Sequence, residues 1–215
     1  MKKLLISTGV SLLLMSSAWA VNGSQNVAAD VCFTPSGQCG NLIVKTIAEA
    51  TQSIDVQAEN FTSQPIADAL VAAQKRGVKV KVLLDKVNVN SRNSVVSLLT
   101  KNKVPFLIDY KPAVAYNKVI LIDNKTVITG NFAFTKAAET QDAGNILIMR
   151  NPEIAGIYQS NFDKRQKDSE QLATYCQSST KCQLESVANK AVDATSKAAN
   201  SAWSSTKEFW NKHTS

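Results

Sequence analysis

The chain has 215 residues, which suits one domain with an appendage, and 44% of its residues are hydrophobic, enough for a buried core. Its formal net charge is +7, from 24 Lys and Arg against 17 Asp and Glu. A moderately basic protein can bind nucleic acid, anionic lipid or an envelope polymer, but the charge can also serve only to keep the protein soluble. The net charge alone does not distinguish these roles. After the first 20 residues no segment is long and apolar enough to cross a membrane, which excludes a membrane-embedded mature chain.

The first 20 residues have the three parts of a secretory signal peptide. Lys2 and Lys3 precede an apolar run at 4–15, and a small-x-small cleavage site ends at Ala20. A membrane anchor is the alternative, but the apolar run is shorter than the roughly 20 residues that a bilayer requires. The sequence therefore predicts an exported chain at 21–215, periplasmic or secreted, whose net charge is +5 because two lysines are lost with the leader.

Alternating apolar residues predict strands, and apolar residues three and four apart predict helices. The predicted elements are, in chain order, a strand at 27–33, a helix at 41–51, a strand at 53–59, a helix at 65–76, a strand at 78–84, a helix at 90–102, strands at 104–108, 118–122 and 126–129, a short helix at 134–140, a strand at 145–149 and a long polar helix at 152–170. Ser63 is a candidate helix cap, and Asn124 and Lys125 are expected to form a hairpin turn. This order predicts an α/β domain at 21–172, a mixed sheet flanked by helices.

The segment at 173–215 is predicted to be a disulfide-closed turn followed by a weakly amphipathic helix. A narrow apolar stripe is formed by Leu184, Ala188, Ala191, Ala198, Ala202 and Phe209. Such a helix can pack back on the domain or fray, which is the favoured interpretation because alanines bury little apolar area each. Trp203 and Trp210 lie beside lysines and suit an interface, so docking onto a membrane surface or an envelope protein is the alternative.

Four cysteines lie in two local pairs, which predicts the disulfides Cys32–Cys39 and Cys176–Cys182 in an oxidising compartment. The pairing is inferred from proximity, since four cysteines allow three pairings. A metal site is the rival interpretation, but no histidine or acidic cluster accompanies the cysteines and their spacings do not match zinc ligands. Short loops of this kind add about 2–3 kcal/mol of stability each.

The segment with the clearest chemical signature contains Tyr116, Lys118 and Asp123 in the spacing Y-x-K-x4-D, followed by Gly130 and Asn131. It resembles the H-x-K-x4-D and G-S-x-N motifs of the phospholipase D superfamily, in its small bacterial Nuc-type endonuclease branch. The resemblance covers about 27–165. It extends to segments at 32–35, 61–63, 69–78 and 134–139.

The resemblance implies one motif per chain and a homodimer in which two motifs meet at the interface. In the family one histidine attacks phosphorus and the other protonates the leaving group, lysines hold the phosphate oxygens, and the aspartate orients an imidazole. The resemblance implies no metal and no cofactor, since paired cations and hydrogen-bond donors stabilise the transition state.

Carried onto this chain, the motif gives three catalytic positions: Tyr116, Lys118 and Asp123. Lys118 matches the phosphate-binding lysine, and Asp123 matches the orienting aspartate. Tyr116, however, stands where the family has its histidine, and the chain's only histidine is His213. Losing the imidazole removes a nucleophile that attacks while neutral and leaves phosphorus readily.

The positions implied to bind phosphate are Lys118, Gly130, Asn131 and Asn145. Gly130 fits the tight turn and Asn145 matches the family, but Asn131 replaces a serine. Ala133 replaces the following asparagine, and Gly144 aligns with the late glutamate that supports the histidine. Such combined losses indicate relaxed constraint on catalysis.

Three functions are consistent with these observations. The favoured one is an inactive or impaired phospholipase D-like protein that binds a phosphodiester, in nucleic acid or phospholipid, or an envelope partner. The second is an active metal-independent phosphodiesterase using Tyr116, although a phenol that titrates near pH 10 needs a base or cation beside it. The third is a structural dimer that docks through its C-terminal helix.

Overall fold

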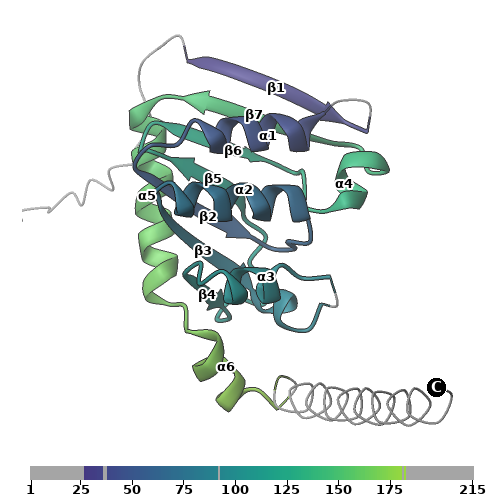
Figure 1. The fold of residues 1–215 in the computed structure, drawn as a ribbon, viewed down its shortest axis with the longest axis vertical. Coiled ribbons are helices and arrows are strands. Elements are labelled where there is room, and N and C mark those ends of the chain that lie inside the picture. Colours follow the sequence, from purple (N-terminus) through teal and green to yellow (C-terminus); the bar gives the residue numbers. More distant parts are fainter. Residues whose placement is uncertain (1–26, 36–37, 92, 181, 183–215) are drawn as a thin grey trace, which may run out of the picture.

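The computed structural model describes residues 27–35, 38–91, 93–180 and 182. In this part of the chain seven strands form one sheet in the order β1-β7-β6-β5-β2-β3-β4 (Figure 1). The strands are β1 (Ala28–Thr34), β2 (Ser53–Ala58), β3 (Lys79–Asp85), β4 (Phe106–Asp109), β5 (Lys118–Ile122), β6 (Thr126–Gly130) and β7 (Gly144–Arg150). The helices are α1 (Cys39–Ala48), α2 (Gln64–Lys75), the 3-10 helix η1 (Lys86–Val89), α3 (Val96–Lys101), α4 (Lys136–Thr140), α5 (Pro152–Lys167) and α6 (Leu172–Ser178).

The sheet is mixed, as the sequence predicts. β2, β3 and β4 run parallel, whereas β5, β6, β7 and β1 follow one another antiparallel. Lys118 at the start of β5 pairs with Ala58 at the end of β2. The motif segment therefore lies at the carboxyl ends of the parallel strands, the edge where α/β sheets commonly hold their ligands.

The two faces of the sheet have separate cores because side chains alternate along each strand. The face covered by α1 and α2 carries the larger core (Figure 1). Ile43 of α1, Leu70 of α2 and Ile120 of β5 are fully buried in it. On the other face Leu121 and Val127 pack with Phe162 of α5.

Local signals explain where several helices begin and end. Asn151 accepts a hydrogen bond from the Ile154 amide at 3.0 Å and Pro152 follows it, so α5 starts with a side-chain cap and a proline at its first turn. Gly77 ends α2 with a φ of 91°. Ser63 occupies the N-cap position of α2, but its side chain makes no cap hydrogen bond, so that part of the prediction is wrong.

The predicted helix at 90–102 is the largest departure from the sequence analysis. Its α-helical part is only α3, Val96–Lys101, and the separate 3-10 helix η1 precedes the predicted range. The buried Asn88 side chain of η1 donates to the Glu59 and Asp85 carbonyls and accepts from the Phe61 amide. The Val95 amide donates to the Phe61 carbonyl at 3.1 Å, so contacts with the segment after β2 hold the chain on both sides of 90–94.

The end of α5 and the position of the hairpin turn also differ from the prediction. α5 ends at Lys167 rather than 170, because Glu170 pairs through its backbone with Ile108 of β4. The hairpin turn is centred on Asp123 and Asn124, with φ values of 52° and 55°, rather than on Asn124 and Lys125. The helix α6 was not predicted at all.

Both predicted disulfides are present, Cys32–Cys39 with a Cα–Cα distance of 5.5 Å and Cys176–Cys182 with 5.0 Å. The first joins β1 to the start of α1. The leader, the helix predicted beyond residue 183, and His213 all lie outside the described residues. Within the described part, no helix combines the length and apolar character that a membrane crossing requires.

Candidate functional site

Lys118 is the centre of the candidate site, and its ammonium group is already paired. Its Nζ donates to the Glu59 carboxylate at 2.5 Å and to the Tyr116 carbonyl at 3.2 Å. The Lys118 side chain is 15% exposed and that of Glu59 is 25% exposed, so water reaches the pair only in part. An ammonium has three donors, so one remains for a ligand while Glu59 stays in place.

Tyr116 lies beside this lysine but points into solvent. The residue is 69% exposed, and its ring centroid is 5.9 Å from the Lys118 Nζ, within reach of a cation–π attraction. Among the residues that the structure describes, none hydrogen-bonds to the Tyr116 hydroxyl. The tyrosine therefore has a nearby cation, and no base among the described residues is hydrogen-bonded to its hydroxyl.

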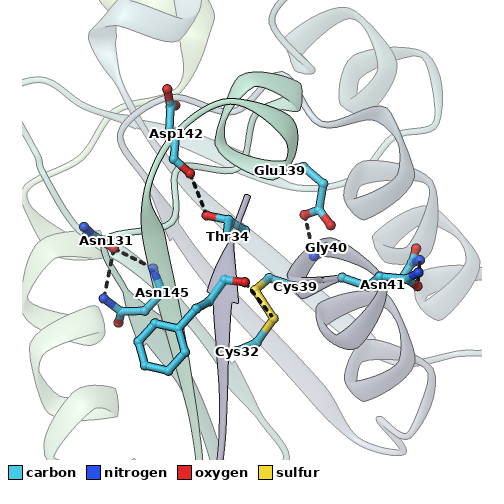
Figure 2. The surroundings of a disulfide bond; sticks show 11 residues. Cys32, Thr34, Cys39, Gly40, Asn41, Asn131, Glu139, Asp142 and Asn145 are labelled. Carbon is cyan, nitrogen blue, oxygen red and sulfur yellow. Dashed lines mark hydrogen bonds between the residues drawn. A yellow bond between two sulfur atoms is a disulfide. The ribbon is translucent and has the colours of Figure 1, made fainter. Parts of the chain in front are cut away.

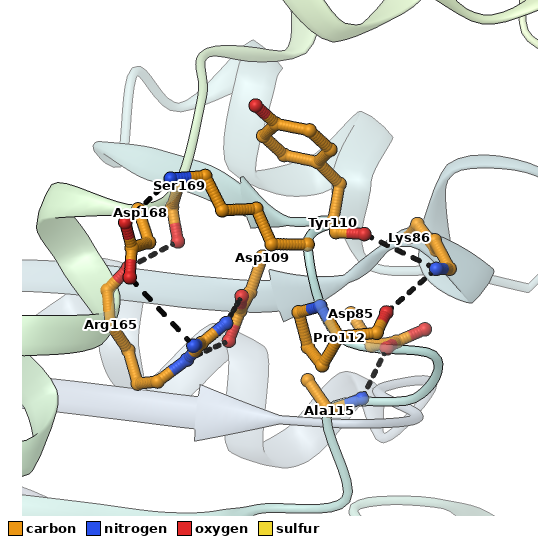
Figure 3. Close-up of polar contacts among 10 residues, drawn as sticks. Asp85, Lys86, Asp109, Tyr110, Pro112, Ala115, Arg165, Asp168 and Ser169 are labelled. Carbon is orange, nitrogen blue, oxygen red and sulfur yellow. Dashed lines mark hydrogen bonds and ion pairs between the residues drawn. The ribbon is translucent and has the colours of Figure 1, made fainter.

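The segment leading to Tyr116 is held by the ends of β3 and η1 (Figure 3). The buried Asp85 carboxylate accepts hydrogen bonds from the Val87 amide at 2.8 Å and the Ala115 amide at 2.6 Å. Lys86 donates to the carbonyls of Tyr110 at 3.2 Å and Pro112 at 2.8 Å. These contacts hold the segment at 110–115, which precedes Tyr116. The Asp85 and Lys86 side chains bond to backbone groups and not to the side chains of the motif.

A second polar cluster joins this segment to α5, also visible in Figure 3. Arg165 makes a two-pronged hydrogen-bonded ion pair with the buried Asp109, one prong from Nε at 3.0 Å. That hydrogen bond is the main cause of the raised pKa of Arg165. Nearby, Lys111 pairs with Asp168 at 2.6 Å on the surface. The cluster is structural, since each charge is matched within it.

Asn131 and Asn145, two of the predicted phosphate-binding residues, lie beside each other (Figure 2). The Asn131 side-chain oxygen accepts from the Asn145 amide at 2.8 Å and from its side-chain nitrogen at 3.2 Å. Gly130 has a φ of 148°, and a Cβ there would collide with the Asn145 carbonyl oxygen. Gly130 and Lys118 occupy adjacent strand ends, one step beyond the Val119–Thr129 pair of β5 and β6.

Asn131 also fills the space beside Gly144, the position that aligns with the family's glutamate. A Cβ at Gly144 would lie 3.3 Å from the Asn131 oxygen and 3.2 Å from the Thr34 hydroxyl oxygen. Contacts of 3.0–3.4 Å require a neighbour to shift. The replacements at 131 and 144 therefore fit each other, and a larger side chain at 144 would compete with Asn131 for room.

Asp123 is not brought together with Tyr116 and Lys118. It follows β5 at the end opposite Lys118, about 17 Å away at roughly 3.3 Å per residue. Its carboxylate accepts four hydrogen bonds at 2.8–2.9 Å, from the Thr51 amide and hydroxyl and the amides of Gln52 and Ser53. Burial alone would raise the pKa of Asp123, but these hydrogen bonds outweigh it and lower the pKa. Within one chain Asp123 ties the hairpin to β2 and cannot directly orient position 116.

Sequence reasoning missed Glu59, the residue that contacts Lys118 most closely. It follows β2, and its amide donates to the Asn117 carbonyl at 3.2 Å, which continues the pairing of β2 with β5. The only available signal was a charged residue directly after a buried strand. That signal could not name Lys118 as its partner without the strand order.

A groove of about 860 Å³ lies away from the motif, at the start of β3 and β4. Its walls include Phe106, Leu172 and Lys103. None of the predicted site residues lines it, so it is separate from the candidate site.

Comparison with known proteins matches this chain and its fold to a defined family. The family model described as "Cardiolipin synthase, PLD-like domain" matches residues 43–166, more than half of the chain. A protein of Rickettsia typhi named phospholipase D is 42% identical over 134 residues, which cover 62% of this chain and 66% of that protein. This chain therefore matches slightly under two thirds of that relative's length.

Solved structures of this family have the same fold as this chain. Nuc from Salmonella typhimurium, a phospholipase D family member, has 34% identity and a TM-score of 0.64, covering 67% of this chain and 97% of its own. NucT from Helicobacter pylori, at 22% identity and a TM-score of 0.62, covers 68% of this chain and 99% of its own, and shares the fold. The chain belongs to the phospholipase D superfamily and, within it, to the Nuc-type branch.

Proposed function

We propose that this chain is a non-catalytic or strongly impaired Nuc-type protein that binds a phosphodiester at Lys118. The observation that carries the proposal is Tyr116, which occupies the histidine position, is 69% exposed and has no described hydrogen-bond partner on its hydroxyl. A phenolic hydroxyl is a weak nucleophile unless a base takes its proton. Removing a nucleophile commonly costs several orders of magnitude in rate.

The binding half of the proposal rests on what remains of the site. Lys118 keeps one ammonium donor, and Asn131 and Asn145 lie near the same end of the sheet. Phosphate oxygens are bound by such cations and donors without any metal. The ligand would be a nucleic acid or phospholipid phosphodiester, or the same chemistry presented by an envelope partner.

We also propose that two copies associate so that two Lys118 side chains face one ligand. One free donor per chain is little for a phosphate with several acceptor oxygens, and a second copy doubles it. Exposed apolar residues in η1 and in the segment before Lys118 are available for such contact: Val87 is 50%, Val114 38% and Tyr116 69% exposed. Export to an oxidising compartment remains part of the proposal, supported by the two disulfides.

The test is hydrolysis and binding by the exported form, residues 21–215, with DNA and a chromogenic diester in the presence of chelator. We expect no turnover above that of Lys118→Ala, together with ligand binding that this variant loses. Chelator-resistant turnover that disappears in Lys118→Ala would overturn the impaired-enzyme proposal.

The alternative, catalysis by Tyr116, is favoured by one observation, the Lys118 ammonium 5.9 Å from its ring. A cation stabilises a phenolate and so could activate it. In that case Tyr116→Phe would abolish turnover while leaving diester binding intact, and a phosphotyrosine adduct at residue 116 would be detectable by mass spectrometry.

A further inference from the structure

The cation of the candidate site is neutralised by a carboxylate of its own chain. Glu59 and Lys118 stand at the ends of neighbouring strands, and their side chains meet at 2.5 Å. Both side chains are at least three-quarters covered, which distinguishes this pair from the open Lys111–Asp168 pair, exposed at 51% and 37%. A carboxylate and a phosphate oxygen make the same kind of hydrogen bond to an ammonium, so they compete for it.

We propose that Glu59 is the selectivity-determining residue of the Lys118 site, and this inference rests on the proposed function. Its carboxylate holds one Lys118 donor and places a negative charge beside the donor that remains. An anionic ligand must therefore overcome that charge or displace Glu59, which disfavours weakly binding anions such as inorganic phosphate. A phosphodiester held by further contacts can complete the exchange.

The backbone around Glu59 allows this exchange to be a side-chain movement. Its amide donates to the Asn117 carbonyl at 3.2 Å, and its carbonyl accepts from the buried Asn88 side chain at 2.6 Å. The main chain is therefore fixed on both sides, and only the side-chain torsions of Glu59 need to change. Asp85, the next acid along this edge, is occupied by two backbone amides and does not substitute for it.

Glu59→Gln tests the proposal, because it removes the charge and keeps the size of the side chain. Phosphate and dimethyl phosphate are titrated by calorimetry into residues 21–215 carrying Glu59→Gln, and separately Glu59→Ala. We expect affinity for both anions to rise about fivefold or more, the factor that corresponds to about 1 kcal/mol for a partly exposed ion pair. Thermal melts check that each variant is folded.

Glu49→Gln is the matched control for net charge. Glu49 is exposed and caps the end of α1, before β2 begins, whereas Glu59 directly follows β2, so the same charge is removed at a position that does not contact Lys118. The gain should be absent in Glu49→Gln and lost again in the double variant Glu59→Gln with Lys118→Met. Equal affinities in wild type, Glu49→Gln and Glu59→Gln would overturn the inference.

The failures of the two proposals are distinguishable. If wild-type protein binds the diester through Lys118 and Glu59→Gln and Glu59→Ala add nothing, the proposed function stands and the role of Glu59 is wrong. If wild-type protein binds no diester and Glu59→Gln binds it through Lys118, Glu59 controls the site and the proposed function of the native chain is wrong.

Discussion

At the scale of single residues, Lys118 and Asp123 have the residue types of the motif, but their contacts within the chain differ from the roles that the motif predicts. Lys118 matches the motif lysine in spacing. Its ammonium group is partly exposed and forms an ion pair with the Glu59 carboxylate. Asp123 keeps its identity too, yet its four hydrogen bonds all go to Thr51–Ser53 backbone and hydroxyl groups. The motif predicts which positions form the site, and the contacts in the structure show how each of these side chains is held.

Asp123→Ala should lower the free energy of unfolding by about 2–3 kcal/mol, because three backbone amides and one hydroxyl lose their acceptor. Urea denaturation measures the loss. Asp123→Asn is the control, since asparagine tolerates the positive φ and keeps one oxygen acceptor, so its loss should be smaller. Equal stability of wild type and Asp123→Ala would show that these hydrogen bonds contribute nothing net.

The same residue predicts a pH dependence. The folded state lowers the pKa of Asp123 below its ordinary 3.8, so its stabilisation is full above that value and is lost as pH falls through the folded pKa. Burial raises the pKa of Asp55, which acts in the opposite direction. The difference in stability between wild type and Asp123→Asn cancels the Asp55 contribution, and it should shrink below about pH 4.

Gly130→Ala should destabilise the protein by about 2 kcal/mol or more, since its φ of 148° is unfavourable for alanine and the new Cβ meets the Asn145 carbonyl oxygen. Gly156→Ala in α5 is the matched control, because nothing lies within 4 Å of its Cβ position. Alanine there should stabilise the helix by up to about 1 kcal/mol. Thermal melts of both variants compare them directly, and a neutral Gly130→Ala would contradict the steric argument.

At the scale of elements, the sequence predicted what local pattern controls and missed what distant contacts control. All seven strands of the described sheet were predicted, and β5 has the predicted bounds. The helix expected at 90–102 begins only at Val96, after Val95 donates its amide to the carbonyl of Phe61, a residue far away in the sequence. The Glu59–Lys118 pair was missed for the same reason, because it depends on β2 lying beside β5.

An ion pair between Arg165 and Asp109 joins α5 to β4, the edge strand of the sheet. Arg165→Met should cost about 3 kcal/mol, because it leaves the buried Asp109 carboxylate without its cation. Adding Asp109→Asn should recover part of this loss. Lys111→Met is the control at the exposed pair with Asp168 and should cost less than about 1 kcal/mol. Chemical denaturation gives all three values, and similar losses for Arg165→Met and Lys111→Met would contradict this role of burial.

At the scale of the whole molecule, the fold class followed from the sequence, but the arrangement of the site residues on the sheet did not. A resemblance along most of the domain identified the family and the cluster of Lys118, Gly130 and Asn131. It could not show that β5 carries Lys118 and Asp123 to opposite ends of the sheet. That separation arises because a strand extends about 3.3 Å per residue, and it removes Asp123 from the site of its own chain.

The position of β1 has a consequence for how the chain acquires its structure. β1 is the first strand of the described chain, yet its sheet partner is β7, with Ala28 opposite Arg150. During synthesis or export from the amino terminus, β1 has no partner strand until residue 150 has emerged. The Cys32–Cys39 bond spans only seven residues and needs no other part of the sheet. Oxidation can thus precede docking, leaving β1 tethered to α1 while it waits for the strand that completes the sheet.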